Sequence, residues 1–534
     1  MFRWGIWKLI SLIINKRKFI VSNQSANNKR IAKNTLMLYI RMLFLMITSL
    51  YTTRVVLKAL GVEDYGIYNA VGGFVAMFSI VSGSLSAAIS RFITFELAKD
   101  DIDKINKIFS TAVLIQTLLS LIIIVLILTV GLWFLNTQMT IPIDRVYASN
   151  WVFIFSAITF LVNLLSVPYN ACIIAHEKMT AFAYIGIIDA LGRLLISYFI
   201  LISPIDKLIF YAILLCTLSI LIRLLYSWYC KRNFQECKFR WGIDKNIIKE
   251  IFAFAGWNFI GSSAGILKEQ GVNVLLNVFC GPAVNTARGI AIQISTAVSQ
   301  FSQNFITAIN PQITKSYANN NHGYMIFLLE EGAKFSFFML FTMSLPIIIN
   351  TPYILQLWLG EYPDYSVVFV QLVLLTSIHD SISSPLVTAM LATGKLKKYQ
   401  IVVGGIQLMN LPISYLILRL GYPPTSVFVV SLLFSFVCLV ARIYMLKEMI
   451  DLSIKKFIKN VYIKIILVSL ISFIIPYLFI PYIAKNFIGF FISCLICIIA
   501  SISTIYFVGC SCQERIYIIN VLKGIKRKFL NGKN

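Results

Sequence analysis

The sequence predicts an all-α integral membrane protein with about fourteen transmembrane helices. Of its 534 residues, 58% are apolar and only 13% are charged, whereas about a quarter are charged in a typical soluble protein. The mean hydropathy is +0.82. The apolar runs are long and lack strict alternation, and the hydrocarbon core admits only helices or closed barrels, so the runs predict helices. This composition excludes a disordered chain, a collagen-like fibre and an ordinary cytosolic enzyme.

Fourteen apolar segments are each long enough to cross a membrane, which takes roughly 20 helical residues. Short joints rich in Gly and Pro separate them, such as Gly281-Pro282 and Pro423-Pro424. Before them, residues 1–33 lack a signal-peptide cleavage site and predict an amphipathic stretch on the inner leaflet. The segments are 34–57, 67–94, 107–135, 149–174, 180–203, 208–230, 249–279, 284–310, 325–350, 366–393, 399–419, 425–446, 460–482 and 487–509.

The distribution of basic residues predicts the orientation of these spans. The chain has 47 Lys and Arg against 22 Asp and Glu, a net charge of +25. With the N-terminus in the cytoplasm, 32 of the basic residues fall in inner segments, 5 in outer segments and 10 within spans. Cytoplasmic loops of membrane proteins collect Lys and Arg, so both termini are expected in the cytoplasm and the number of spans is expected to be even. The excess of base therefore indicates topology rather than nucleic-acid binding.

An internal repeat is visible when the chain is shifted by 220 residues. Leu60-Gly61 then falls on Cys280-Gly281, and the first two spans fall on the seventh and eighth. A shift by six spans, an even number, predicts two parallel six-helix repeats. The expected divisions are an interfacial segment 1–33, an N-lobe 34–230, a basic cytoplasmic linker 231–248, a C-lobe 249–449, two further spans in 450–510 and a basic cytoplasmic tail 511–534.

Basic residues within the spans are the first candidates for function, because charge at membrane depth is costly. Arg41 and Arg54 in the first span and Arg288 in the eighth have no acidic residue close in sequence, and Lys268 lies in the seventh. Arginine binds phosphate oxygens bidentately and stays charged when desolvated. These four residues predict a water-filled cationic cavity between the lobes, suited to an anionic head group. The alternative is that the arginines are structural and bind backbone carbonyls.

Other intramembrane charges have local explanations. Asp189 with Arg193, and Glu330 with Lys334, are opposite charges at i and i+4 and predict ion pairs on one helix face. Arg442 lies near a cytoplasmic helix end, where its side chain is expected to snorkel to the interface.

Acidic residues and one histidine provide candidates for coupling or gating. Glu269, Asp189 and Asp380 are these candidates. His379 is adjacent to Asp380 and faces another side of the helix; it is either a proton shuttle or a hydrogen-bonded core residue.

Motifs for catalysis are missing from the sequence. It contains no phosphate-binding P-loop, zinc-protease or nucleophile-elbow motif. Cys494-x-x-Cys497 lies inside an apolar run without a second motif, so we expect no metal site. Neither catalytic residues nor cofactors are expected.

The stretch from Arg41 to Asn69 resembles bacterial polysaccharide-export flippases of the multidrug/oligosaccharidyl-lipid/polysaccharide (MOP) superfamily. It reads R-x6-T-S-L-Y-x2-R-V-V-L-x-A-L-G-V-x-D-Y-G-I-Y-N, with a weaker echo at Gly281 to Pro311. The resemblance implies a V of two six-helix lobes around a central cavity, with two added C-terminal helices as in the lipid II flippase. It also implies that the four basic candidates bind the pyrophosphate of the substrate.

The function that the resemblance implies is transfer of an undecaprenyl-pyrophosphate-linked oligosaccharide from the inner to the outer leaflet of the bacterial cytoplasmic membrane. Expected partners are this lipid-linked oligosaccharide, membrane lipids, a polysaccharide polymerase and glycosyltransferases, and no nucleic acid. One alternative is a drug or cation antiporter of the same superfamily, whose mark would be buried carboxylates in the N-lobe. A membrane-embedded glycan polymerase or ligase is a second alternative, but the outer loops, about 136–148 and 351–365, are short for it.

Overall fold

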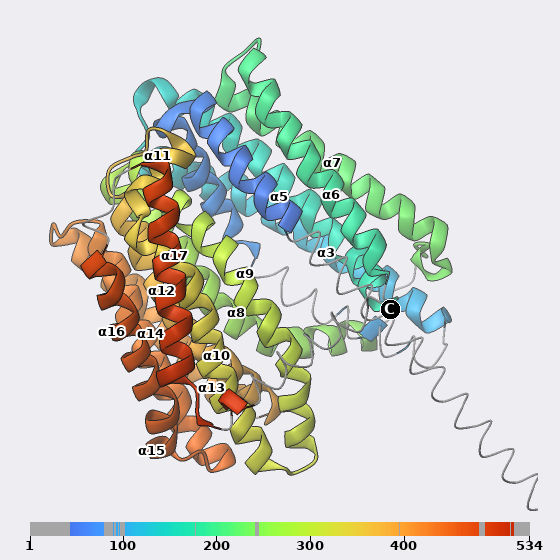
Figure 1. Cartoon of the computed structure of the whole chain (residues 1–534). Coiled ribbons are helices and arrows are strands. Elements are labelled where there is room, and N and C mark those ends of the chain that lie inside the picture. The colour runs from blue at the N-terminus through green and yellow to red at the C-terminus, as the bar shows by residue number, and fades with distance from the viewer. Residues whose placement is uncertain are drawn as a thin grey trace, which may run out of the picture. The chain divides into compact units, whose positions relative to one another are not determined.

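The structure is a computed structural model that describes most of the chain after residue 42. The expectations for residues 1–33, for Arg41, for residues 80–88 and for residues 517–534 lie outside the described part. Every regular element among the described residues is a helix (Figure 1). The described residues are 43–79, 89, 92, 93, 96, 102–176, 178–240, 245–394, 396–479, 486–512 and 514–516.

Helices follow one another along the chain with short connections. The first described helix is Leu43–Ala76. It is followed by α3 (Ile102–Leu126), η1 (Ile127–Gly131), α4 (Leu132–Thr137), α5 (Val146–Ala175), α6 (Met179–Phe199), α7 (Lys207–Asn233), η4 (Gln235–Cys237), α8 (Lys245–Cys280) and α9 (Pro282–Ala318). The remaining helices are α10 (His322–Ile349), α11 (Thr351–Leu359), α12 (Ser366–Ala392), α13 (Leu396–Arg419), α14 (Thr425–Ile450), α15 (Ile454–Phe457), η5 (Ile458–Tyr462), α16 (Ile463–Phe479), α17 (Phe487–Thr504) and η7 (Ile505–Gly509).

The chain is a multi-pass, all-helical membrane protein. Within the described residues, 11 helical segments are long and apolar enough to cross a membrane. The helices α8 and α9 are long enough, with 36 and 37 residues, but are not among these 11. The Ser, Thr, Gln and Asn residues of α9 lower its hydropathy, which is expected of a helix that lines a polar pocket. The count of fourteen spans stays a prediction.

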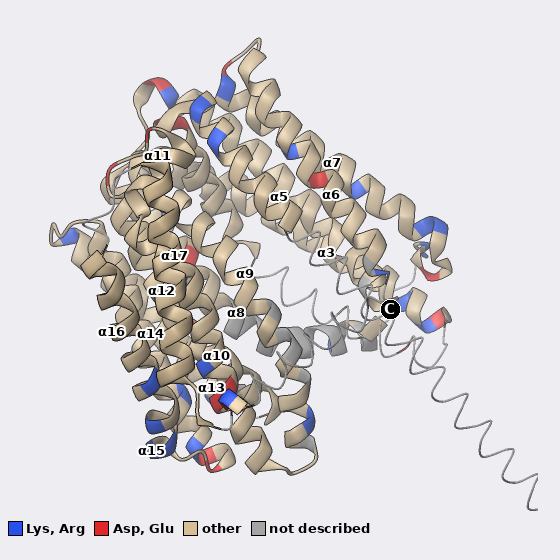
Figure 2. Ribbon diagram, in the orientation of Figure 1, with Lys and Arg blue, Asp and Glu red and all other residues tan. Residues whose placement is uncertain are grey.

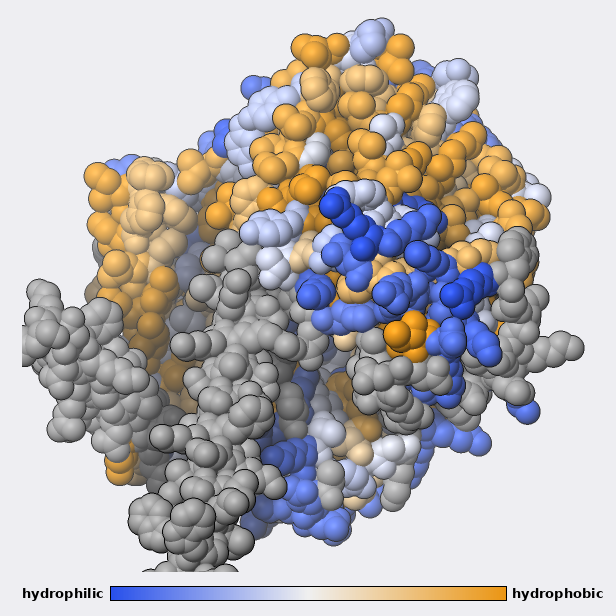
Figure 3. All heavy atoms as spheres, turned by 90° about the vertical axis from the view of Figure 1, so that its right-hand side faces the viewer, coloured by the Kyte–Doolittle hydropathy of each residue, from blue (hydrophilic) through white to orange (hydrophobic). Residues whose placement is uncertain are grey.

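The described residues form two compact units. Unit 1 comprises Met1–Ala59, Leu85–Leu128 and Ile154–Ala253. In it α6 packs along α7, and both helices expose large apolar side chains such as Leu195, Leu224 and Trp228. Figure 3 shows apolar side chains spread over a wide area of one face, with hydrophilic ones gathered below them. Such exposed apolar surface fits contact with lipid rather than water.

Unit 2 comprises Leu60–Ser84, Thr129–Phe153 and Phe254–Asn534, and α12 lies at its centre. The helix α12 packs against α9, α10 and α14, and α14 packs against α13. The two C-terminal helices α16 and α17 pack along each other, and α17 also packs against α10. Charged residues gather near the helix ends, and long helix segments carry none (Figure 2).

Two glycines that the 220-residue shift aligns adopt the same left-handed backbone conformation. Gly61 has a φ of +83° and Gly281 a φ of +82°, a conformation that L residues with a Cβ rarely adopt. Each glycine therefore redirects the chain, and Pro282 then starts α9 at a position where its missing N–H costs nothing.

Contacts around these turns are reciprocal. The Thr286 hydroxyl donates to the carbonyl of Val62 at 2.6 Å. Gly66 lies against the carbonyl of Pro282, and a Cβ at Gly66 would be only 1.9 Å from that oxygen. Under the 220-residue shift, Pro282 is the equivalent of Val62, and Thr286 is the equivalent of Gly66. The contact of Val62 with Thr286 therefore has its counterpart in the contact of Pro282 with Gly66. The repeat itself stays a prediction, and this reciprocity supports it.

Candidate functional site

A polar pocket lies within unit 2 and is lined by residues of α8, α9, α12, α13 and α14. Its volume is about 480 Å³. Four of the charged residues singled out in the sequence line it, and they come from three helices: Lys268 and Glu269 from α8, Arg288 from α9 and Asp380 from α12. Their meeting depends on the packing of α12 against α9, because Arg288 and Asp380 are 92 positions apart.

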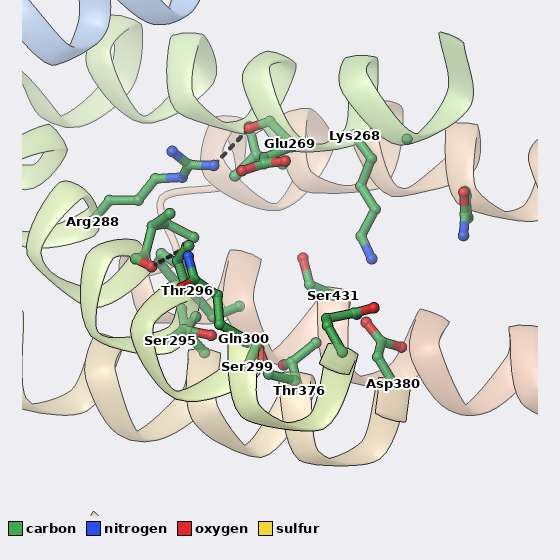
Figure 4. A pocket seen from close by; sticks show the side chains of 18 residues that line it. Lys268, Glu269, Arg288, Ser295, Thr296, Ser299, Gln300, Thr376, Asp380 and Ser431 are labelled. Carbon is green, nitrogen blue, oxygen red and sulfur yellow. Dashed lines mark hydrogen bonds between the residues drawn. The ribbon is translucent and has the colours of Figure 1, made fainter. Parts of the chain in front are cut away.

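The two cations of the pocket differ in their partners. Arg288 is 7% exposed, and its Nη2 donates to the backbone carbonyl of Glu269 at 2.7 Å. Lys268 is half-buried and points from α8 toward Ser431 and Asp380 across the pocket (Figure 4). Within the described residues its ammonium makes no hydrogen bond or ion pair. Lys268 is thus available to a ligand, while Arg288 also braces α8.

Two carboxylates share the pocket with these cations. Glu269 is exposed and lies close to the buried guanidinium of Arg288. Asp380 is half-buried, and its Oδ1 accepts a hydrogen bond from the Ser435 hydroxyl. Since the two cations and two carboxylates carry opposite formal charge, the pocket is polar and close to neutral rather than purely cationic. The acids of α8 and α12 face the same space as the bases, while the expected cationic cavity between the lobes stays a prediction.

Hydroxyl and amide side chains make up much of the remaining wall. Ser295 on α9 and Ser377 on α12 bond each other at 2.7 Å. Such groups both donate and accept hydrogen bonds, as the hydroxyls of a sugar require. They come from α9, α12, α13 and α14: Ser295, Thr296, Ser299, Gln300, Gln303, Thr376, Ser377, Gln407 and Ser431.

Behind Asp380 lies a hydrogen-bonded chain that the sequence did not reveal. Ser435 Oγ bonds His379 Nδ1 at 2.6 Å, and His379 Nε2 bonds the Tyr462 hydroxyl at 3.1 Å. His379 and Asp380 make no direct bond, as expected for neighbours on a helix, but both reach the same serine. The adjacent pair His379-Asp380 was the part of this chain that the sequence indicated. The other members, Ser435 on α14 and Tyr462 on η5, are distant in sequence.

Arg442 lies near this chain, and its expected snorkelling to the interface is wrong. The residue is 6% exposed, and its Nε has no hydrogen-bond partner in the described structure. The face of α14 that carries Arg442 is buried, so the Arg442 guanidinium stays among helices instead of reaching water.

The remaining candidates lie apart from the pocket lining. Arg54 is an exposed residue of the helix Leu43–Ala76 in unit 1. Asp189 and Arg193 form the expected ion pair at 3.1 Å on α6. Arg41 lies outside the described residues.

The expected pair of Glu330 with Lys334 is wrong. Lys334 bonds Glu331 at 3.0 Å and Glu514 at 2.7 Å, whereas Glu330 accepts from Asn460 at 2.9 Å. The i+3 neighbour and a residue 180 positions away displace the i+4 partner, because the C-terminal segment packs against α10.

Comparisons with known proteins decide the family. Residues 29–317, more than half of the chain, match the family model described as polysaccharide biosynthesis protein. The chain belongs to this family. The family match covers the stretch Arg41 to Asn69 and the helices α8 and α9, including Lys268, Glu269 and Arg288.

A relative of the chain is distant in sequence. The uncharacterized membrane protein EpsK of Bacillus subtilis (strain 168) is 20% identical over 275 residues. That match covers 51% of this chain and spans about half of EpsK, at 54% of its length.

Comparison with solved structures shows the fold of this chain. The lipid II flippase MurJ in an inward closed conformation has a TM-score of 0.64 at 15% identity, over 89% of this chain and 98% of MurJ. An inward-facing multidrug resistance MATE transporter of the MOP superfamily has a TM-score of 0.62 at 10% identity, over 77% of this chain and 98% of the transporter. The chain therefore has the MOP-type fold.

Proposed function

We propose that the protein moves a lipid-linked oligosaccharide from the inner to the outer leaflet of the bacterial cytoplasmic membrane. The observation that carries the proposal is the pocket of unit 2, where Lys268, which bonds no other described residue, lies among hydroxyl and amide side chains. An ammonium attracts the oxygens of a pyrophosphate, and the hydroxyl and amide groups match the sugar. Membership of the polysaccharide biosynthesis family supports the same substrate class.

In this proposal Lys268 and Arg288 hold the pyrophosphate inside the pocket. Arg54, and Arg41 beyond the described residues, would contact it at other stages of its passage. Transport proceeds by alternating access without a catalytic step or a bound cofactor, driven by an ion gradient or the membrane potential. The lipid-linked substrate would come from glycosyltransferases and pass to a polysaccharide polymerase. Both termini would face the cytoplasm.

A drug or cation antiporter is the second candidate, and the carboxylates of the pocket favour it. Glu269 is exposed and Asp380 is half-buried in the same space as Lys268, so a cation would also find partners there. The two candidates differ in the charge of the cargo, and substitutions at the pocket separate them.

The test compares Lys268→Ala with Glu269→Gln in cells that lack the chromosomal copy. A flippase predicts that knockout cells accumulate the lipid-linked oligosaccharide on the inner leaflet and that Lys268→Ala fails to relieve this. Lys268→Ala removes one charge-assisted contact with the pyrophosphate, which is worth about 1.5–3 kcal/mol. The transport rate is therefore expected to fall roughly tenfold to hundredfold.

Arg193→Ala is the matched control, since Arg193 pairs with Asp189 on α6 outside the pocket lining, and membrane abundance is measured for each variant. The antiporter would instead be established by knockout cells that have normal surface glycan and are more sensitive to cationic dyes. In that case the wild-type protein restores dye resistance and Glu269→Gln does not.

A further inference from the structure

The hydrogen-bonded chain behind the pocket has a defined direction. Ser435 has one hydroxyl hydrogen, which it donates to Asp380 Oδ1, so its bond of 2.6 Å to His379 requires Nδ1–H as the donor. A neutral imidazole with Nδ1–H leaves Nε2 as an acceptor, and the Tyr462 hydroxyl donates to it at 3.1 Å. Every hydrogen therefore points from Tyr462 toward Asp380.

Both ends of this chain are more accessible than its middle. Asp380 lines the pocket and is half-buried, and Tyr462 is half-buried beside the exposed residues Lys459 and Asn460. The middle is enclosed: Ser435 is 2% and His379 is 6% exposed, and the imidazole lies 3.9 Å from the ring of Phe436, measured between centroids. An enclosed chain between two accessible ends has the form of a proton wire.

The charged groups around the chain come from several helices. Arg442 and Cys438 approach it from α14, Lys268 and Glu269 line the pocket from α8, and Arg288 lines it from α9. The helix α13 contributes Gln407 to the pocket, α11 contributes no acidic or basic side chain, and α10 carries Glu330, Glu331 and Lys334.

We propose that Asp380 is a proton-binding site of the transporter and that Ser435, His379 and Tyr462 conduct protons to it. In one passage water protonates the Tyr462 oxygen, Tyr462 gives its own proton to His379 Nε2, His379 gives its Nδ1 proton to Ser435, and Ser435 gives its proton to Asp380. Each intermediate group loses one proton and gains one, so the net change is one proton moved from water to Asp380. The reverse sequence restores the starting arrangement.

Such a route lets Asp380 exchange protons while cargo fills the pocket. The coupling of that proton to transport rests on the proposed function, whereas proton binding by Asp380 does not. The coupling ion would then be a proton, and Asp380 would bind it in the wall of the pocket that also holds the substrate. Two kinds of measurement keep these claims separate.

The first measurement uses the full-length protein in phosphatidylethanolamine and phosphatidylglycerol vesicles and needs no cargo. Infrared difference spectra recorded as the pH is lowered should contain a protonated-carboxyl band that Asp380→Asn removes. Ser435→Ala should shift this band because it deletes the hydrogen bond to Asp380, while Ser501→Ala, a buried serine bonded only to its own helix, should not. A band that is intact in Asp380→Asn overturns the proton site.

The second measurement follows a fluorescent polyprenyl-pyrophosphate sugar in the same vesicles. Tyr462→Phe and Ser435→Ala should lower transport driven by a pH gradient by about tenfold or more, yet leave exchange without a gradient unchanged. Tyr477→Phe, at a tyrosine that is 69% exposed on α16, is the matched control.

Gradient-driven transport at wild-type rates in both wire variants overturns the wire. Wild-type protein that exchanges no probe at all would contradict the proposed function, while the infrared result would still decide whether Asp380 binds a proton.

Discussion

Lys334 is the most deeply buried of the charged side chains that the structure describes, with 1% exposure, and two carboxylates surround its ammonium. Glu331 comes from the same helix and Glu514 from the segment that follows η7. The Ser511 backbone N–H also donates to Glu514 at 3.0 Å. These bonds fasten the end of the C-terminal pair of helices to α10.

Lys334→Met is expected to lower the free energy of unfolding by about 3–5 kcal/mol, because it removes a buried cation and leaves two half-buried carboxylates without their partner. Thermal unfolding in detergent measures the loss. Lys398→Met is the control: Lys398 and its partner Glu448 are both exposed, so removing this pair should cost under about 1 kcal/mol. Equal effects of the two substitutions would contradict the structural role of Lys334.

The pH dependence of stability should report on Glu514. Burial raises its pKa, but hydrogen bonds from Lys334 and Ser511 outweigh burial and hold the pKa at about 2, against an ordinary value of 4.5. The ionised form is therefore favoured by folding. Its contribution is fully present above about pH 4.5 and is lost as the pH falls toward about 2. The difference in melting temperature between wild type and Glu514→Gln should be constant above that range and shrink below it; a difference that grows on acidification contradicts this.

At the scale of elements, the residues that follow Gly61 and those that follow Gly281 contact each other directly. Gly66 has no room for a side chain because the Pro282 carbonyl lies in the way, whereas Gly72 in the same helix has no atom within 4 Å of its potential Cβ. The two positions therefore separate the effect of a close contact from the general effect of replacing glycine in a helix.

Gly66→Ala is expected to destabilise the protein by about 1–3 kcal/mol, because the added methyl group forces backbone apart. Gly72→Ala is expected to be neutral or to stabilise by up to about 1 kcal/mol, because alanine favours helix more than glycine. Melting temperatures of the two purified variants measure the difference. If Gly66→Ala were as stable as Gly72→Ala, the close approach at Pro282 would be wrong.

At the scale of the whole molecule, the predicted topology rests on the Lys and Arg count of 32 inner against 5 outer residues. Reporter fusions placed after successive helices should alternate in their activity, and a fusion at the C-terminus should be active only on the cytoplasmic side. A C-terminal fusion that is active in the periplasm would show that the number of spans is odd, and the assignment of inner and outer loops would then fail.

Composition and hydropathy by themselves predicted the all-helical membrane class and identified the charged residues within the spans, while the number of spans stays a prediction. The reason is that lipid forces each span to satisfy its backbone within one continuous helix, so the spans can be recognised locally. Lys268, Glu269, Arg288 and Asp380 stood out for the same reason, since charge is rare in such helices. The Asp189–Arg193 pair was also predictable, because its partners are one helical turn apart.

Only the tertiary structure decided which of these residues meet. Asp380 reaches Ser435, 55 positions later, and Lys334 reaches Glu514, 180 positions later, because α12 packs against α14 and α10 against the C-terminal helices. Sequence spacing describes neighbours on one helix but not the face that a second helix presents to it. The near-neutral pocket and the directed chain from Tyr462 to Asp380 therefore depend on helix packing, which hydropathy along a single chain does not encode.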